Sequence, residues 1–309
     1  MKLTKTKLIF IGVSTGGSSI MRIFPRWSEI LGLNCEIVGV DLPLRAPADN
    51  YRRVLQDIIA DPTAMGALIT AHKIDMLRAC RDKIDELDEY ARICDEVSCI
   101  IKRDGKLLGF AKDPISSAQA LSHFVPRGHW RDDARDVLCL GVGGAAVAIS
   151  VCMARASAAD GQPSRFLLTD IAPERLRSIR QVHQRLATPL QFEYHLCEGA
   201  ADNERLLRGV APGSLVINAT GLGKDLPGSP LTPAATFPQD ALVWELNYRG
   251  ERDFMRQALA QAEALNLSVE DGWRYFVHGW TEVIAEVFEL ELDSEALARL
   301  SASASTNRP

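Results

Sequence analysis

The chain has 309 residues, which is too many for one ordinary compact domain and comfortable for two. Hydrophobic residues make up 47% of it, so a sizeable core is available and disorder is not expected. The formal charge is −5, from 35 basic and 40 acidic residues, and no long basic run occurs, which disfavours nucleic acid or a membrane surface as a partner.

The start of the chain favours a buried first strand over a signal peptide, because its short apolar run meets glycine and serine at once. No stretch of about 18 apolar residues is present to span a bilayer. The seven cysteines are scattered and form no Cys-x-x-Cys pair, which suits reduced thiols and predicts no metal site. Together these features predict a soluble, cytoplasmic, globular protein.

In chain order, the first part of the sequence alternates strands with helices. The predicted strands are 7–12, 35–41 and 66–70, and the predicted helices are 20–31, 49–61 and 75–91. This alternation predicts a parallel α/β layer.

The pattern changes near residue 113, where a predicted helix (116–124) leads into a polar stretch (126–135). Strands at 136–140, 165–170, 190–195, 215–218 and 241–246 then alternate with helices at 145–158 and 174–186. This βαβαβ order predicts a Rossmann-type doubly wound sheet. Helices at 254–265 and 273–288 close the chain, and residues 301–309 are predicted to fray. The predicted fold is therefore α/β, with a substrate and catalytic domain (1–115, to which 270–309 return) and a Rossmann dinucleotide-binding domain (116–269).

A glycine-rich turn follows the apolar strand at 136–140 and precedes a helix of small residues. Its residues are Gly141, Val142, Gly143, Gly144, Ala145 and Ala146. Gly141 permits a tight turn, Gly143 lets backbone N–H groups approach a pyrophosphate, and the helix N-terminus attracts the anion. The alternative is a glycine-rich connector in a purely structural sheet.

Asp170 ends the next strand, where a carboxylate accepts hydrogen bonds from the adenine ribose hydroxyls and repels a 2′-phosphate. NAD is therefore predicted in preference to NADP, although Arg175 and Arg177 argue the other way. The alternative role for Asp170 is that of a helix N-cap before Pro173.

Six motifs occur in an order and spacing that carry a resemblance. They are residues 12–21, a glycine with a serine-rich loop; residues 67–73, Ala-Leu-Ile-Thr-Ala-His-Lys; residues 109–113, Gly-Phe-Ala-Lys-Asp; the glycine turn; Asn218-Ala219-Thr220; and Asp271-Gly272. Through them nearly the whole chain resembles the shikimate/quinate dehydrogenase superfamily, as a divergent member.

The resemblance implies that Lys73 and Asp113 form the catalytic pair and that Asn218, Ala219 and Thr220 belong to the cofactor site. It also allows a homodimer. The family's substrate-binding asparagines, however, fall at Ala67 and Ala111. These departures predict a substrate other than shikimate.

The pair also makes chemical sense from the residue types alone. Interconversion of an alcohol and a ketone needs a hydride acceptor or donor and a group that exchanges the hydroxyl proton. A lysine withdrawn from water and opposed by a carboxylate holds such a proton. Lys73 follows a buried strand and Asp113 precedes the domain junction, where a cleft is expected.

The other predicted substrate contacts are polar side chains near these motifs. They are Ser14, Thr15, Ser18, His72, Tyr248 and His278. His72 has a packing or hydrogen-bonding role as its alternative, and the loop hydroxyls have loop capping as theirs. His278 falls beside the position of the family's binding glutamine.

The sequence thus predicts an NAD-dependent oxidoreductase that interconverts a secondary alcohol and a ketone on a small hydroxylated acid or cyclitol-like substrate. Two other functions stay open. One is a non-catalytic dinucleotide-sensing or regulatory protein, motivated by Ala67 and Ala111. The other is a folate-linked one-carbon dehydrogenase, which has a related two-domain layout and a lysine in its cleft.

Overall fold

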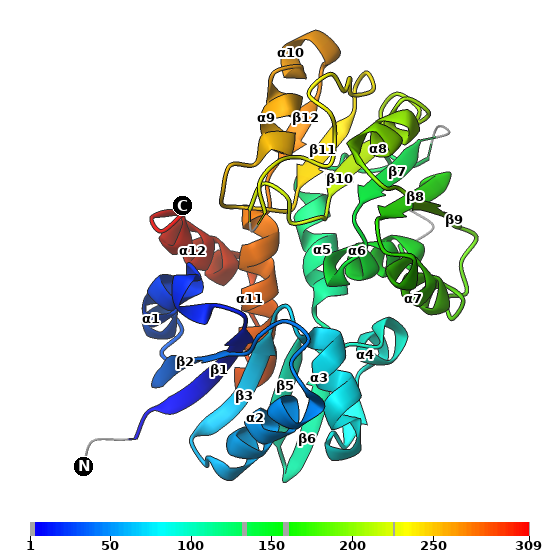
Figure 1. The fold of residues 1–309 in the computed structure, drawn as a ribbon. Coiled ribbons are helices and arrows are strands. Elements are labelled where there is room, and N and C mark those ends of the chain that lie inside the picture. Colours follow the sequence, from blue (N-terminus) through cyan, green and yellow to red (C-terminus); the bar gives the residue numbers. More distant parts are fainter. Residues whose placement is uncertain (1–3, 132–134, 157–160, 225, 309) are drawn as a thin grey trace. The chain divides into compact units, whose positions relative to one another are not determined.

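The computed structural model describes residues 4–131, 135–156, 161–224 and 226–308, and its elements are labelled in Figure 1. The chain divides into two compact units. Unit 1 contains Met1–Asp113 and Gly279–Pro309, and unit 2 contains Pro114–His278. The sequence places the corresponding divisions at 115/116 and 269/270.

Unit 1 is built on a six-stranded sheet with the strand order β2-β1-β3-β5-β6-β4. The strands are β1 (Thr6–Gly12), β2 (Cys35–Asp41), β3 (Ala64–Ile69), β4 (Glu86–Leu87), β5 (Cys99–Arg103) and β6 (Lys106–Phe110). β1 runs parallel to β2 and β3, whereas β5 runs antiparallel to β3 and β6. The three predicted strands are parallel as expected, but the sheet as a whole is mixed, because the β5–β6 hairpin lies where the sequence predicted no strand.

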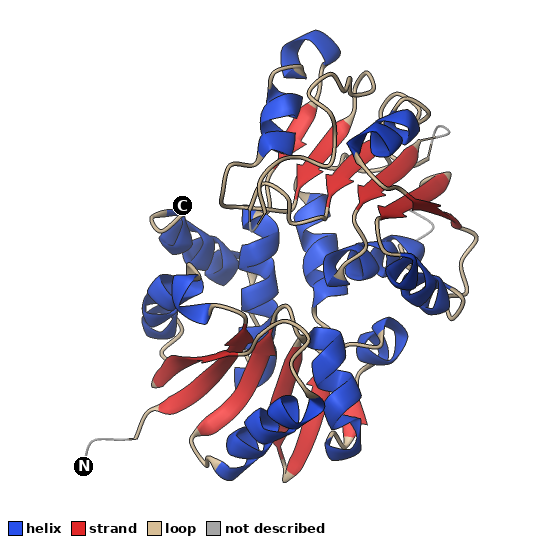
Figure 2. Cartoon of the chain, viewed as in Figure 1, coloured by secondary structure: helices blue, strands red, loops and turns tan. Residues whose placement is uncertain are grey.

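Helices flank this sheet (Figure 2). They are α1 (Ile20–Ile30), α2 (Ala48–Ala60), α3 (Lys73–Cys80), α4 (Glu89–Cys94) and α12 (Ser294–Ser305), with short 3₁₀ turns at Thr15–Gly17 and Arg81–Lys83. The single predicted helix over 75–91 is wrong, since α3 ends at Cys80 and β4 precedes α4. The predicted fraying from 301 onward is also wrong as far as Ser305. There α12 continues, and Trp27 Nε1 donates a hydrogen bond to Leu300 O (2.9 Å).

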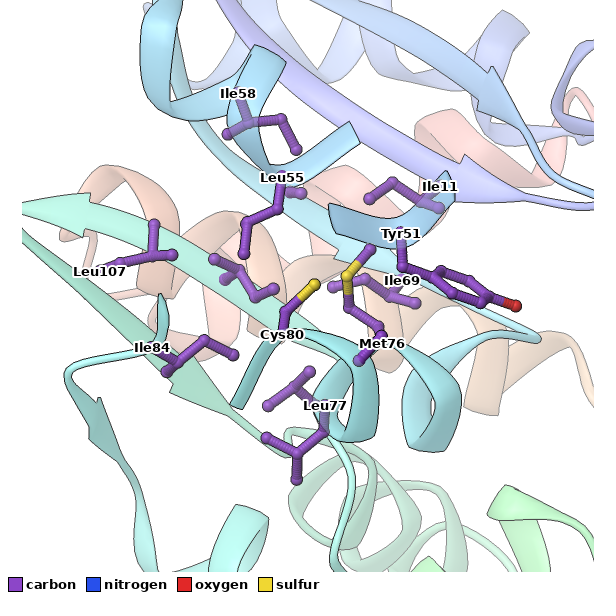
Figure 3. Packing of buried hydrophobic residues seen from close by; sticks show 14 of the residues in the cluster. Ile11, Tyr51, Leu55, Ile58, Ile69, Met76, Leu77, Cys80, Ile84 and Leu107 are labelled. Atoms are coloured by element: carbon purple, nitrogen blue, oxygen red, sulfur yellow. The ribbon is translucent and has the colours of Figure 1, made fainter. Parts of the chain in front are cut away.

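The core of unit 1 lies between the sheet and α2 and α3 (Figure 3). Tyr51, Leu55 and Ile58 recur at helical spacing on α2 and are all buried. They pack with strand residues such as Ile11 and Ile69. This packing fixes the end of β3, where Lys73 follows.

Unit 2 contains a six-stranded, fully parallel sheet with the order β12-β11-β10-β7-β8-β9. The strands are β7 (Asp136–Leu140), β8 (Arg165–Asp170), β9 (Gln191–Leu196), β10 (Leu215–Asn218), β11 (Leu242–Glu245) and β12 (Ser268–Glu270). Every residue of the central strand β7 is buried, as the apolar run predicted. The Rossmann-type sheet is confirmed.

The helices of unit 2 are α5 (Asp113–Ser122), whose first residue belongs to unit 1, α6 (Gly144–Ala154), α7 (Pro173–His183), α8 (Ala200–Leu207), α9 (Asp253–Leu259) and α10 (Ala262–Leu265). The end of the predicted helix at 157–158 lies outside the described residues. The predicted helix over 254–265 is instead two helices, α9 and α10. Helix α11 (Trp273–Phe288) begins in unit 2 and ends in unit 1, and its bounds match the prediction. Among the described residues, no helix has the length and apolar composition needed to cross a bilayer.

Candidate active site

Lys73 is the first residue of α3 and follows the buried strand β3 after a three-residue turn. The turn is held to β1, because the backbone N–H of Thr70 donates to Ile11 O (3.1 Å). A cation in the first turn of a helix opposes the helix dipole. The local structure therefore disfavours the ammonium form of Lys73 unless an anion compensates it.

Asp113 supplies that anion. Lys73 Nζ donates a hydrogen bond to Asp113 Oδ2, and their side chains are only 17% and 12% exposed. Asp113 begins α5, where a carboxylate is stabilised by the helix N-terminus. Burial lowers the pKa of Lys73, and the nearby Glu96 and Cys94 act in the opposite direction. The pair is thus a partly desolvated proton-holding group with an orienting carboxylate.

His72 is fully buried and uses both ring nitrogens. Nε2 lies 3.1 Å from the Leu42 carbonyl oxygen and Nδ1 lies 3.0 Å from the Tyr51 hydroxyl. A carbonyl only accepts, so Nε2 carries the proton and Nδ1 accepts from Tyr51. The geometry favours the structural alternative for His72 over contact with a substrate.

The three predicted hydroxyl contacts lie in the loop after β1 and differ in their burial and hydrogen bonding. Thr15 is buried, and both its N–H and its hydroxyl donate to Asp41 Oδ1 (2.8 and 2.6 Å), which lowers the pKa of Asp41. Ser14 is exposed and Ser18 is half-buried. Thr15 therefore ties the loop to the end of β2, and Ser14 and Ser18 stay candidates for substrate contact.

Ala67 and Ala111 are both fully buried. Ala67 lies within β3, and the N–H of Ala111 donates to Asp88 Oδ1 (3.1 Å). A methyl group offers no hydrogen bond at either position. The residues that depart from the family pattern therefore contribute packing, not polar recognition.

The glycine turn of unit 2 has the geometry that the sequence predicts. Gly141 has φ +93°, and a Cβ there would lie 2.9 Å from the backbone of Ala219 and Thr220. Gly143 precedes α6, and a Cβ built on it meets nothing within 4 Å. Gly143, Gly144 and Ala145 are partly exposed. The space beside Gly143 is therefore open, at a helix N-terminus of the kind that binds a pyrophosphate.

Asp170 braces this turn. Its Oδ2 accepts from Val142 N (2.8 Å) and its Oδ1 from Ala172 N (2.9 Å), while Arg175 Nη1 lies 3.8 Å away. The Asp170 side chain is only 5% exposed, so its observed role is to hold the turn, and the ribose contact stays a prediction. The next residue, Ile171, is 75% exposed and uncharged.

The Asn218-Ala219-Thr220 segment is held by side-chain hydrogen bonds. Asn218 is buried, and its Oδ1 accepts from the N–H and hydroxyl of Thr220 (3.1 and 2.7 Å). Its Nδ2 donates to Glu245 Oε2 (2.9 Å), and the N–H of Asn247 donates to Glu245 Oε1 (2.9 Å). Asn218 thus positions the backbone that contacts Gly141. Glu245 was not singled out from the sequence, although it ends a buried strand beside the predicted cofactor residues.

Glu245 makes the stability of the protein depend on pH. Burial is the main cause that raises its pKa from 4.5 to about 7. Between pH 4.5 and pH 7, Glu245 is ionised in the unfolded chain but still protonated in the folded protein. The free energy of unfolding therefore falls as pH rises, by up to about 3 kcal/mol above pH 7.

We expect Glu245→Gln to remove this fall in the free energy of unfolding, as measured by urea unfolding at pH 5 and pH 8. The exposed Glu263→Gln controls for the substitution, and equal slopes for wild type and Glu245→Gln would contradict the assignment.

Tyr248 and His278 lie among aromatic rings of unit 2. The Tyr248 ring is 4.5 Å from that of Phe276, and His278 stacks on His123 with their Nε2 atoms 3.1 Å apart. Burial, followed by His123 and Arg274, lowers the pKa of His278 to about 4. Both imidazoles are therefore neutral at pH 7, with one donating to the other. His123 was missed because it falls in a predicted helix with no motif.

Within the described ranges, no group of three or more His, Cys, Asp or Glu residues is arranged to hold a metal ion. The seven cysteines are all free thiols.

Comparisons with known sequences and solved structures show which proteins the chain is similar to. It is 31% identical over 179 residues to the shikimate dehydrogenase (NADP(+)) of Streptococcus gordonii, a match that spans 58% of each chain and so leaves over two fifths of that relative unmatched. No protein-family model matches. The fold is that of a shikimate dehydrogenase solved in complex with NADP+ (TM-score 0.74, 19% identity, 99% and 96% of the two chains covered). The chain is therefore similar in sequence to shikimate dehydrogenases and shares their fold.

A second solved structure widens the comparison. The ligand-free 5-ketofructose reductase of Gluconobacter sp. strain CHM43 shares the fold with a TM-score of 0.70 and 20% identity, over 97% of this chain and 99% of that one. The same fold is therefore found in a protein named for a substrate other than shikimate.

The late Asp-Gly motif has a structural explanation. Asp271 is buried, accepts from Trp273 N (3.0 Å) at the start of α11, and pairs with Arg252 (2.9 Å). A Cβ on Gly272 would overlap Leu246 O. The motif therefore joins the end of the Rossmann sheet to α11 and needs no ligand to account for it.

Proposed function

We propose that the protein is a nicotinamide-dependent dehydrogenase that interconverts a secondary alcohol and a ketone on a small hydroxylated acid or cyclitol-like substrate. The observation that carries the proposal is the Lys73–Asp113 pair, which is mostly withdrawn from water and lies at the carboxyl end of a buried strand. Lys73 exchanges a proton with the substrate oxygen, and Asp113 orients the amine. Similarity to shikimate dehydrogenases supports the same assignment.

The cofactor site proposed is the glycine turn with the Ala219–Thr220 backbone. The positive φ of Gly141 and the open space at Gly143 fit a pyrophosphate at the start of α6. When bound, the nicotinamide ring accepts or supplies the hydride. The chain's own part is to bind and orient the dinucleotide through backbone N–H groups.

We further propose that NAD is preferred to NADP, because the Asp170 carboxylate repels a 2′-phosphate and lies against Arg175, the nearest cation, while exposed Ile171 carries no charge. Asp170→Asn is expected to lower the ratio of NAD affinity to NADP affinity about tenfold. The substitution removes the repulsion between the carboxylate and the 2′-phosphate and keeps one acceptor oxygen. Fluorescence titration with both dinucleotides measures this ratio. An unchanged ratio in a protein that still binds would count against the ribose contact.

The substrate proposed differs from shikimate because Ala67 and Ala111 are buried methyl groups where the family's recognition uses amides. The 5-ketofructose reductase of the same fold supports a substrate other than shikimate. Ser14 and Ser18 are proposed to contact substrate oxygens, with Tyr248 and His278 as further candidates.

Turnover tests the proposal. NADH absorbance is followed on a panel of hydroxy acids, cyclitols and sugar acids in both directions, alongside dinucleotide binding by fluorescence. Turnover of one class is the expected result. Tight binding with no turnover on any compound would instead support the non-catalytic sensing protein.

A further inference from the structure

Glu96 is a carboxyl group sealed inside unit 1, between α4 and β5. Its side chain is 0% exposed, and neither Oε1 nor Oε2 has a hydrogen-bond partner among the residues that the structure describes. A buried ionisable group without hydrogen bonds is costly to fold, whereas an apolar side chain of similar size is not. Packing alone gives no reason for a carboxyl group at this position.

Glu96 lies next to the proposed active site. The N–H of the following residue, Val97, donates to the Lys73 carbonyl oxygen (3.3 Å), and Ile69 N donates to Ser98 O (2.9 Å). The segment is thereby fixed against the end of β3 and the first residue of α3. The Glu96 charge acts on the Lys73 amine and on the buried Cys94 thiol.

We propose that Glu96 is a positioning residue of the Lys73 site, whose sealed charge keeps the lysine amine protonated and ready to donate to a carbonyl oxygen. The inference rests on the proposed function, because only there does the Lys73 proton serve a reaction. Asp113 orients the amine through a hydrogen bond, while Glu96 acts through its field, which water does not screen. Burial raises the pKa of Glu96 and Lys73 lowers it, so the two groups titrate as a coupled pair.

The melting temperature of Glu96 variants distinguishes this positioning role from a purely structural one. If the carboxyl group is retained for its charge, replacing it by a neutral side chain of similar volume relieves the burial cost. Glu96→Met and Glu96→Gln should therefore melt at the wild-type temperature or about 3 °C above it at pH 8. A carboxyl group needed for folding would give lower melting temperatures in both variants.

The decisive experiment measures the titration of Lys73 directly, without cofactor or substrate. The full-length protein is labelled competitively with isotopic acetic anhydride from pH 6 to pH 11, and the Lys73 peptide is quantified by mass spectrometry. Glu96→Gln and Glu96→Met should lower the Lys73 midpoint by about one pH unit. Glu96→Asp, which keeps the charge, should restore most of that shift.

The matched control is Asp95→Asn, which removes one negative charge from the neighbouring exposed residue and should leave the Lys73 midpoint unchanged. A Lys73 midpoint in Glu96→Gln within 0.3 unit of wild type would overturn the inference. So would a shift of equal size in Asp95→Asn. The labelling needs no turnover, so the two proposals can fail separately. If Glu96→Gln shifts the Lys73 midpoint but the wild-type protein turns over no compound of the panel, the proposed dehydrogenase function fails and the Glu96–Lys73 coupling is still supported.

Discussion

Replacing Lys73 by alanine is expected to lower kcat/KM by about three orders of magnitude while NAD binding stays close to wild type. The loss follows because the Lys73 amine is the proposed proton-transfer group held by Asp113, and such a positioned group contributes roughly 10²- to 10⁴-fold. The dinucleotide should still bind, since its proposed contacts belong to unit 2. The measurement is steady-state turnover on the substrate found in the panel, with fluorescence titration of NAD on the same preparation.

The surface residue Lys83 supplies the matched control, because Lys83→Ala removes a lysine from the exposed turn that follows α3 and should keep full turnover. Near-wild-type turnover by a folded Lys73→Ala protein would contradict the proposed role of Lys73 in proton transfer. Loss of NAD binding together with turnover would point to a folding defect, which a thermal melt detects.

Gly141→Ala is expected to weaken dinucleotide binding by at least roughly 100-fold and to lower the free energy of unfolding by about 2–4 kcal/mol. Gly141 has φ +93°, which L-residues rarely adopt, and the added Cβ would lie 2.9 Å from the Ala219 and Thr220 backbone. Relief of that overlap must move either the turn or the Asn218–Thr220 segment. Urea unfolding and fluorescence titration measure the two effects separately.

Gly143→Ala separates binding from folding. Its φ of −105° suits alanine, and its Cβ meets no protein atom within 4 Å. Stability should change by less than about 1 kcal/mol, while binding weakens because the methyl group occupies the space proposed for the pyrophosphate. Wild-type binding by both variants would show that the turn does not hold the cofactor.

Five of the six strands of the Rossmann unit could be predicted closely because local sequence determines them, whereas the three-residue edge strand β12 was missed. β8 is an apolar run between turn residues, and its observed bounds are those predicted. Its register and the position of Asp170 follow from the parallel order. The predicted helix at 75–91 failed for the opposite reason. Leu77, Cys80, Ile84 and Leu87 are all buried at helical spacing, so periodicity did not reveal the break after Cys80.

The β5–β6 hairpin carried a usable signal that was overlooked. Asp104 and Gly105 separate its two strands and have φ of +52° and +74°, as a tight Asp-Gly hairpin turn requires. Glu96 had no such signal. Its burial and its neighbour Lys73 depend on how β3, α3 and α4 pack, and no local pattern reports that.

The most direct test of the central claim is a crystal structure of the protein with a dinucleotide and its substrate bound. We predict a substrate hydroxyl or carbonyl oxygen about 3 Å from Lys73 Nζ. We also predict the pyrophosphate on the backbone N–H groups at the start of α6. A productive complex in which no substrate oxygen lies within hydrogen-bonding reach of Lys73 would contradict the account.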